Sequence, residues 1–158
     1  MRVFSFRLFS LLLMAVGFAA CSGSDNEKPL VTPSKTELLC NKKYRYISIT
    51  VNPPIQITPD SSITSLWQNC LVDERIEFKI DGRVLVDEGT KSCSSSLPQV
   101  YEDVWKFSPD EKSLIYWEKK TNERTESKIE TLDGRLLKVT FVDTFNSKPY
   151  NITQVLSE

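Results

Sequence analysis

The sequence predicts an all-β protein, an antiparallel up-and-down barrel of eight strands with a short helical segment near one end. Two observations support this fold class. Short segments in which apolar and polar residues alternate recur in chain order with tight turns between them, and only one segment has a helical pattern. Small sheets of this kind close on themselves to remove unpaired edges. Consecutive hairpins without long crossovers favour the up-and-down order.

The first 20 of the 158 residues have the composition of an export signal. Arg2 and Arg7 lie at the basic start, and the apolar run Leu8–Val16 is too short to span a membrane permanently. Two alanines then precede Cys21, a junction that resembles the lipobox of bacterial lipoproteins. We expect a signal peptide over residues 1–20 and acyl chains on Cys21 that hold the protein on a membrane. The alternative is an ordinary signal peptide that is cut after the alanines.

Residues 21–36 are predicted to form a lipidated, flexible tether, and residues 37–158 the folded domain. Ser22–Pro29 is polar, small and acidic, without an apolar period. An acidic stretch just after a lipidated cysteine resembles the surface-export signal of Bacteroidota lipoproteins. We therefore expect an outer-membrane protein whose domain is exposed on the cell surface. A spacer that leaves the domain facing the periplasm is the alternative.

The first predicted strand covers Leu38–Val51. It alternates regularly from Ile47 onward, but Tyr44 and Tyr46 have the opposite parity. Either a bulge interrupts the strand or both of its faces are partly covered. Two prolines end it, and Ser62–Asn69 then has a helical pattern with apolar residues on one side. We expect a short helix there that covers one end of the sheet.

The central hairpin is predicted at Ile76–Val86, where apolar and polar residues alternate around an Asp-Gly pair. A two-residue loop would place apolar residues on both faces of the hairpin. A three-residue loop over residues 80–82, with Gly82 in the left-handed region, pairs Phe78 with Val84 and the two ends of the segment with each other. This register gives the hairpin one apolar face, so we predict it.

Five further strands are predicted along the rest of the chain. They cover Val104–Phe107, Leu114–Glu118, Thr125–Leu132, Arg135–Val142 and Tyr150–Leu156. A second Asp-Gly pair follows Leu132, and the same three-residue loop is predicted there. That loop pairs Ile129 with Leu137 and sets Val139 and Phe141 on the same face.

Two of the cysteines, Cys70 and Cys93, flank the central hairpin, which returns its ends to the same place. An exported protein meets an oxidising compartment, so we expect a disulfide between them, worth roughly 3 kcal/mol by the chain-entropy estimate. The alternative is two reduced cysteines in contact with the core. Cys40 is then the odd cysteine, expected as a small buried residue, with a reactive or intermolecular thiol as its alternative.

The composition argues against several classes of function. Histidine is absent, which excludes a histidine base and every metal site that needs imidazole, and the net charge of −1 comes without a basic stripe. We expect no nucleic-acid partner, no metal and no cofactor, and no serine-nucleophile motif indicates an enzyme. Acidic pairs at Asp73-Glu74, Asp87-Glu88 and Asp110-Glu111 lie beside predicted turns, where we expect them to be solvated.

Several stretches together resemble the lipocalin-like domain of small Bacteroidota lipoproteins. They are the Cys21 junction, LCNKKYRYISITV at Leu39–Val51, Cys70, IEFKIDGRVLVDEG at Ile76–Gly89, Cys93 and VWKFSPDEKSL at Val104–Leu114. Asn41 and Tyr44 stand where the Gly-Lys-Lys-Trp opening of that family has glycine and tryptophan, and Cys40 is extra. The resemblance implies a cup-shaped barrel of the lipocalin or calycin type, without implying a substrate.

The aromatic side chains are the candidates for ligand recognition. The predicted ligand-binding residues are Trp67, Phe78, Trp105, Tyr116 and Phe141. If they line a cavity, the protein is a lipid-anchored binding module for a small apolar or glycan-derived ligand. If they pack as a core, it is a structural barrel whose loops contact another surface protein.

Side chains can fill the interior of an eight-stranded barrel completely. We therefore expect a mostly filled barrel with at most a shallow pocket near Trp67 and Cys93. The side chains expected to fill it are Ile76, Phe78, Val84, Val86, Trp105, Phe107, Leu137, Val139 and Phe141.

Overall fold

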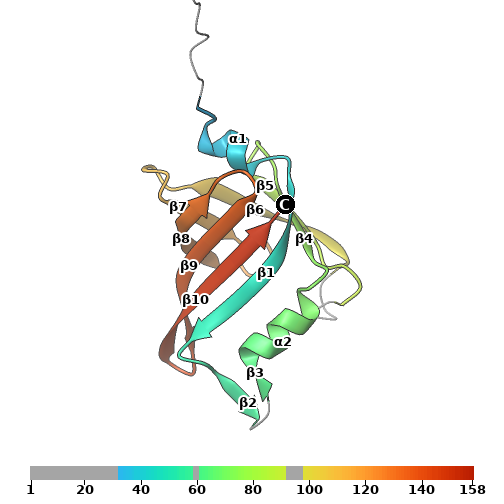
Figure 1. Cartoon of the computed structure of the whole chain (residues 1–158), viewed down its shortest axis with the longest axis vertical. Coiled ribbons are helices and arrows are strands. Elements are labelled where there is room, and N and C mark those ends of the chain that lie inside the picture. The colour runs from blue at the N-terminus through green and yellow to red at the C-terminus, as the bar shows by residue number, and fades with distance from the viewer. Residues whose placement is uncertain (1–31, 59–60, 92–97) are drawn as a thin grey trace, which may run out of the picture. The chain divides into compact units, whose positions relative to one another are not determined.

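The strands of the protein form a closed antiparallel barrel in the computed structural model, which describes residues 32–58, 61–91 and 98–158. The eight strands of the barrel follow one another around it in the order β1-β10-β9-β8-β7-β6-β5-β4, so the predicted fold class is confirmed (Figure 1). They are β1 (Lys43–Asn52), β4 (Arg75–Phe78), β5 (Arg83–Asp87), β6 (Val100–Phe107), β7 (Ser113–Trp117), β8 (Arg124–Leu132), β9 (Leu136–Phe145) and β10 (Lys148–Ser157). The predicted signal peptide and the proposed acylation site, Cys21, lie outside the described residues.

A small insertion separates the first two barrel strands along the chain. It consists of β2 (Gln56–Thr58), β3 (Ser61–Ser62) and the helix α2 (Ile63–Cys70). The predicted helix is thus confirmed, and the side chain of Ser62 caps it by accepting a hydrogen bond from the backbone N–H of Ser65. The hairpin of β2 and β3 was not predicted.

A second helix, α1 (Lys35–Leu39), lies at the upper end of the barrel in Figure 1. Ser34 and Glu37 form a capping box, in which each side chain accepts a hydrogen bond from the other residue's backbone N–H. The prediction of a strand from Leu38 onward was therefore wrong at its start, because the capping box nucleates a helical turn there. The strand begins only at Lys43.

Of the two alternatives for the first strand, the structure shows the bulge. The pairing of β1 with β10 shifts between Tyr46 and Ser48. As a result Tyr44 and Ile49 are both buried although their sequence parity differs, while Ile47 is 58% exposed.

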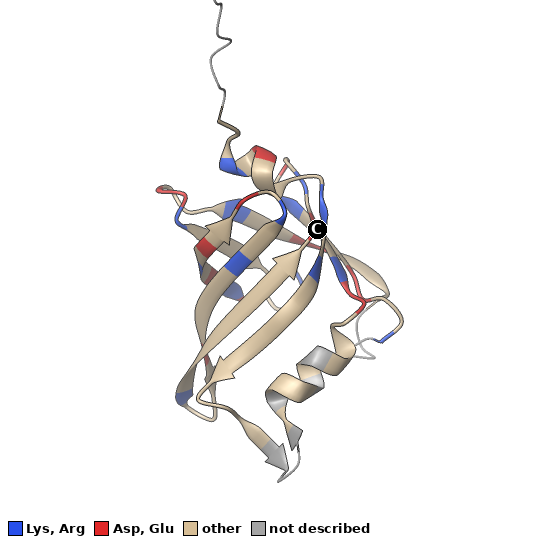
Figure 2. Cartoon of the chain, in the orientation of Figure 1, with Lys and Arg blue, Asp and Glu red and all other residues tan. Residues whose placement is uncertain are grey.

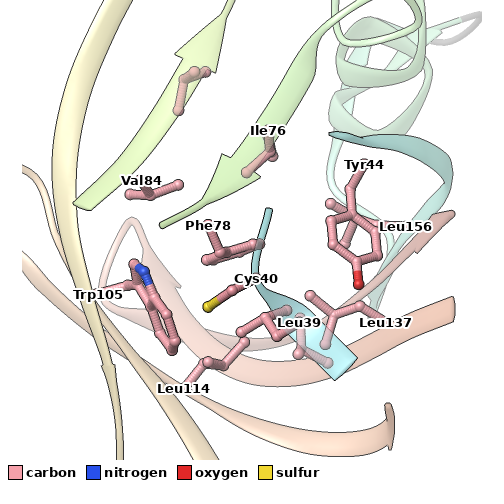
Figure 3. Close-up of a cluster of buried hydrophobic side chains, with 12 residues drawn as sticks. Leu39, Cys40, Tyr44, Ile76, Phe78, Val84, Trp105, Leu114, Leu137 and Leu156 are labelled. Carbon is pink, nitrogen blue, oxygen red and sulfur yellow. The ribbon is translucent and has the colours of Figure 1, made fainter. Parts of the chain in front are cut away.

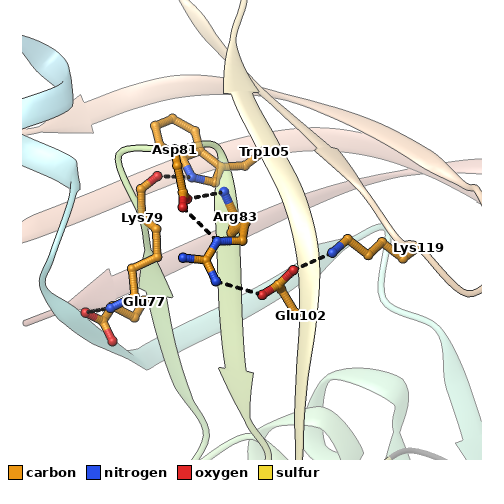
Figure 4. A network of polar contacts seen from close by, with 7 residues as sticks. All are labelled: Glu77, Lys79, Asp81, Arg83, Glu102, Trp105 and Lys119. Atoms are coloured by element: carbon orange, nitrogen blue, oxygen red, sulfur yellow. Dashed lines mark hydrogen bonds and ion pairs between the residues drawn. The ribbon is translucent and has the colours of Figure 1, made fainter.

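The register of the central hairpin is the predicted one. Phe78 pairs with Val84 and Ile76 with Val86, and Gly82 has a φ of 86°. The loop leaves the outer face to charged residues: Arg83 contacts Asp81 at 2.8 Å and Glu102 at 3.1 Å (Figure 4). Exposed ion pairs of this kind contribute little to stability, so the apolar face determines the register.

The predicted register between β8 and β9 was wrong. Ile129 pairs with Val139 instead of Leu137, and a bulge lies between Ile129 and Thr131. The cause is the side chain of Asp133, which accepts hydrogen bonds from the backbone N–H groups of the two residues after Gly134, at 2.9 and 2.8 Å. This closes the turn later than predicted, and the bulge accommodates the shift.

The main hydrophobic cluster fills the end of the barrel at α1. Leu39 and Tyr44 are fully buried there, with Cys40, Phe78 and Trp105 beside them (Figure 3). Rings pack edge to face from Tyr44 to Phe78, at 6.1 Å between centroids, and from Phe78 to Trp105, at 5.5 Å. This end of the barrel is therefore closed.

Two of the three departures from the resembled family, Asn41 and Tyr44, are accommodated in the fold. Asn41 has a φ of 59°, a left-handed conformation that asparagine tolerates better than most residues. Tyr44 occupies the position of the usual tryptophan and is fully buried. The closed end therefore packs without the usual Gly and Trp.

Charged residues of both signs are mixed along the described strands and turns, without an extended run of one sign (Figure 2). Within the described part of the chain, no helix has the length and apolar composition needed to cross a membrane.

Candidate functional site

The interior of the barrel contains a cavity of about 260 Å³. Because side chains of a strand point alternately inward and outward, alternate residues of the barrel strands reach it. Its lining is Tyr46, Glu74, Ile76, Phe78, Val84, Val86, Tyr101, Trp105, Leu114, Ile115, Tyr116, Thr125, Ser127, Leu137, Val139, Phe141, Gln154 and Leu156. The expectation of a mostly filled barrel was wrong in this respect, since the large side chains pack toward the α1 end and leave space beyond them.

Four of the five predicted ligand-binding residues lie together around this cavity. Phe78, Trp105, Tyr116 and Phe141 all contribute to its lining. Trp67 does not: it lies on α2 and packs against a separate cluster that contains Ile49, Val51 and Ile152.

The expected pocket near Trp67 was misplaced, because α2 covers apolar side chains of β1 and β10 instead of bordering the cavity. Of the predicted inward set, Phe107 and Phe141 are only partly buried, and the other seven are buried.

Three carboxylic acids are buried at the side of the barrel where β4, β5 and β6 lie. Glu74, Glu88 and Asp103 are each at most 4% exposed. The prediction that the acidic pairs are solvated was therefore wrong for Glu74 and Glu88, although Asp110 and Glu111 are indeed exposed.

Strand parity was the signal that could have revealed the buried acids. Glu74 has the parity of Ile76 and Phe78, and Glu88 that of Val84 and Val86. Asp103 likewise has the parity of Trp105, at a position that we had not included in a strand.

Two of the buried acids form hydrogen bonds with tyrosine hydroxyl groups. The Tyr116 hydroxyl donates a hydrogen bond to Asp103, whose other oxygen accepts one from the backbone N–H of Lys119 at 2.9 Å. Burial and then the hydrogen bond to Asp103 raise the pKa of Tyr116. Burial and then the charges of Glu74 and Glu88 raise the pKa of Tyr101, which also hydrogen-bonds to Glu88. Both phenols are thus neutral at physiological pH.

Glu74 differs from the other two acids because it lines the cavity, whereas Glu88 and Asp103 are not among the lining residues. No described residue donates a hydrogen bond to that carboxyl, and Arg75 donates instead to the main-chain carbonyls of Asp73 and Glu74 at 3.1 Å. Burial, followed by the negative charges of Glu88 and Asp73, raises the pKa of Glu74 from 4.5 to about 8. Ionisation of Glu74 in this buried position is therefore unfavourable at neutral pH.

The cysteines match the predictions as far as they are described. Cys40 is free and buried, as expected, and burial followed by the charge of Asp81 raises the pKa of its thiol. Cys70, at the end of α2, is disulfide-bonded. Cys93 lies outside the described residues, so the Cys70–Cys93 pairing stays a prediction.

Among the residues that the structure describes, no three or more cysteine, aspartate or glutamate side chains are placed to hold a metal ion together. What the cavity offers is an apolar and aromatic wall, a few hydroxyl and amide groups, and one buried carboxyl group.

Comparison with known proteins finds likeness only at the level of structure. No protein-family model matches the chain, and no curated protein sequence matches it. Bovine odorant-binding protein in complex with its natural ligand has a TM-score of 0.48 and 11% sequence identity, over 81% of this chain and 75% of that one. The same bovine protein in complex with undecanal gives the same values. A likeness at this level carries no argument about function, and the fold described above rests on the strand pairing itself.

Proposed function

We propose that the protein is a lipid-anchored binding protein of the cell envelope whose barrel takes up a small, mainly apolar ligand. The observation that supports this function is the interior cavity, which is walled by apolar and aromatic side chains and contains a few polar groups. Pockets for small molecules typically have this composition. We propose no enzymatic reaction.

The size of the cavity limits the ligand. Its volume of about 260 Å³ is just below the roughly 300–1,000 Å³ of pockets for drug-sized molecules. The ligand is therefore a small molecule of at most two or three rings, or an alkyl chain of similar volume, rather than a long acyl chain or an oligosaccharide.

A neutral apolar dye, N-phenyl-1-naphthylamine, tests the binding function through the rise of its fluorescence in an apolar environment. Val139 is buried and lines the cavity, whereas Val142 on the same strand is largely exposed. We expect saturable one-to-one binding by the native protein and by the control V142W, and at least tenfold weaker binding by V139W.

The test has one main risk, which is that overpacking destabilises V139W. Circular dichroism checks its fold, and V86F narrows the same cavity with a smaller increase in volume. Absence of saturable dye binding by the native protein would overturn the proposed function.

The membrane anchor is a separate part of the proposal and rests on the junction at Cys21. In a host that acylates lipoproteins, C21A should move the protein from the membrane fraction to the soluble fraction. Detergent-phase partitioning that persists in C21A would contradict acylation at this residue. Protease treatment of whole cells then distinguishes the proposed surface location from a periplasmic one.

A protein-interaction function is the alternative, and one observation favours it. Ile47 and Val72 are 58% and 50% exposed, and both border a hollow of about 170 Å³ on the outside of the barrel. Exposed apolar side chains at a hollow are typical of contact sites for other proteins. Failure of the dye to bind, together with loss of association with a protein partner in I47S, would support this alternative function.

A further inference from the structure

We propose that the ligand is an organic amine bound as its cation, with the Glu74 carboxylate as its counter-ion inside the barrel. This inference deepens the proposed function and rests on it. The inference concerns the polar end of the ligand. The apolar wall of the cavity determines the size and shape of the apolar part of the ligand.

The argument starts from the position of Glu74. The residue is 4% exposed, and it precedes β4 with the inward parity of Ile76 and Phe78. It lines the cavity, and none of the described residues donates a hydrogen bond to its carboxyl group. A buried carboxyl group without a hydrogen-bond donor destabilises the folded protein, because its desolvation is not compensated. A ligand that donates a hydrogen bond to this carboxyl group compensates for that loss.

The surroundings of Glu74 favour a positive charge. Neither lysine nor arginine occurs among the described residues that line the cavity. Glu88 and Asp103 are buried nearby and add negative character, but they already interact with Tyr101 and Tyr116. Glu74 is thus the acid that remains for a ligand.

The aromatic wall suits the same kind of ligand. Tyr46, Tyr101, Trp105 and Tyr116 all line the cavity. The faces of aromatic rings attract a desolvated ammonium group, and their surface packs against the apolar body of an amine. A protonated amine with a ring or a short alkyl chain therefore fits the wall and the acid together.

Binding of a cation changes the protonation of Glu74. The groups that face this carboxyl are Glu88 after β5, Asp73 on the same segment, Tyr46 from β1 and Tyr101 from β6. The helix α2 carries no charged residue. The tyrosines remain neutral because their pKa values are raised, so none of these four described groups supplies a positive charge. The guanidinium of Arg75 is next in the chain, but it donates to the main-chain carbonyls of Asp73 and Glu74.

Without the ligand, Glu74 holds its proton up to about pH 8. The bound ammonium favours the carboxylate, and the proton leaves to solvent as the cation binds. Amine affinity should therefore rise about tenfold per pH unit below that pKa and level off above it.

Two probes of nearly the same shape test the proposal, namely 2-phenylethylamine and 2-phenylethanol. An alkylamine with a pKa near that of lysine, about 10.4, stays protonated over the pH range of the test. By isothermal titration at pH 8.5, the amine should bind at least tenfold more tightly than the alcohol. The substitution Glu74→Gln should remove this preference and the pH dependence of amine binding, but leave binding of the alcohol unchanged within about twofold.

Glu77→Gln is the matched control, because Glu77 lies on β4 three residues after Glu74, has the outward parity and pairs with Lys79 (Figure 4). It should bind both probes like the native protein. The pH series on the native protein needs no substitution, so the test holds even if Glu74→Gln does not fold.

The outcomes separate the two proposals. Equal affinity for amine and alcohol, or an amine preference that survives Glu74→Gln, would overturn the amine inference and leave the proposed function standing. If neither probe nor the neutral dye binds, the proposed function fails and this inference fails with it.

Discussion

The hydroxyl group of Tyr44 donates a hydrogen bond of 3.1 Å to the main-chain carbonyl of Leu38, which links the first barrel strand to the helix α1. Tyr44 is fully buried, and burial raises the pKa of its phenol to about 12. The bond satisfies a helix-terminal carbonyl and a buried hydroxyl together. This hydrogen bond therefore acts together with the packing of the aromatic rings at the closed end of the barrel.

Loss of this hydrogen bond should destabilise the fold moderately. We expect Y44F to lower the free energy of unfolding by about 1–2 kcal/mol, because the carbonyl loses a partner while ring packing is kept. Urea denaturation measures the change. Tyr150 is partly buried, and its hydroxyl has no hydrogen-bond partner among the described residues, so Y150F is the control and should change stability little. Equal effects of both substitutions would mean that the Tyr44 bond contributes nothing.

Glu74 should make stability depend on pH. Its pKa is raised from 4.5 to about 8 on folding, so between these values the folded state binds more protons than the unfolded state. Stability from this group is fully present below pH 4.5 and is lost as pH rises toward 8, by an amount on the order of a few kcal/mol.

Thermal unfolding between pH 5 and 8.5 tests this linkage. We expect the unfolding temperature of the native protein to fall as pH rises, and E74Q to show a flatter profile. The exposed-face control E77Q should follow the native profile. A native profile that rises with pH across this window would contradict the burial of Glu74.

Gly89 should be sensitive to any side chain. Its φ is 66°, and a Cβ atom there would lie 2.5 Å from Cγ and 2.8 Å from the main-chain oxygen of Asp73. We expect G89A to cost roughly 2–4 kcal/mol from backbone strain and this clash. Gly82 also has a positive φ, but a Cβ atom there would lie 3.3 Å from its nearest neighbour. G82A should therefore lower the free energy of unfolding by less, about 1–2 kcal/mol. Chemical denaturation ranks the two, and the reverse order would contradict the predicted clash.

The cysteines should differ in reactivity. Cys40 is buried and its thiol pKa is raised, so little thiolate is present and iodoacetamide should leave it unmodified until the protein is unfolded. Non-reducing peptide mapping should recover Cys70 linked to Cys93. A recovered bridge from Cys40 to either would show that the predicted pairing is wrong.

Much of the barrel follows from local pattern. In the central hairpin, only the three-residue loop kept Ile76, Phe78, Val84 and Val86 on one face, and burial of that face makes the register predictable. The β8–β9 turn has the same Asp-Gly pair but closes differently. There the outcome depends on which backbone groups bond to Asp133, and alternation cannot reveal this.

The site was predicted less well, for a different reason. Phe78, Trp105, Tyr116 and Phe141 were expected to act together, and their cavity was expected to be filled. The space left among packed side chains depends on shape and cannot be calculated from parity. Glu74, in contrast, could have been identified, because its inward parity outweighs the usual preference of a charged residue for solvent.

The closure of the barrel is uneven around its circumference. The ladder between β9 and β10 runs along the full length of both strands, whereas β1 and β4 pair only at Lys43 with Glu77 and at Tyr44 with Ile76. Beyond this short seam β1 and β4 have no further paired residues, and Tyr46 borders both the interior cavity and the hollow outside. Local opening costs least where the fewest backbone bonds must break. We therefore expect local opening of the barrel to begin at the side wall next to Tyr46, and backbone amides of β1 beyond Tyr44 to exchange hydrogen sooner than those of β9.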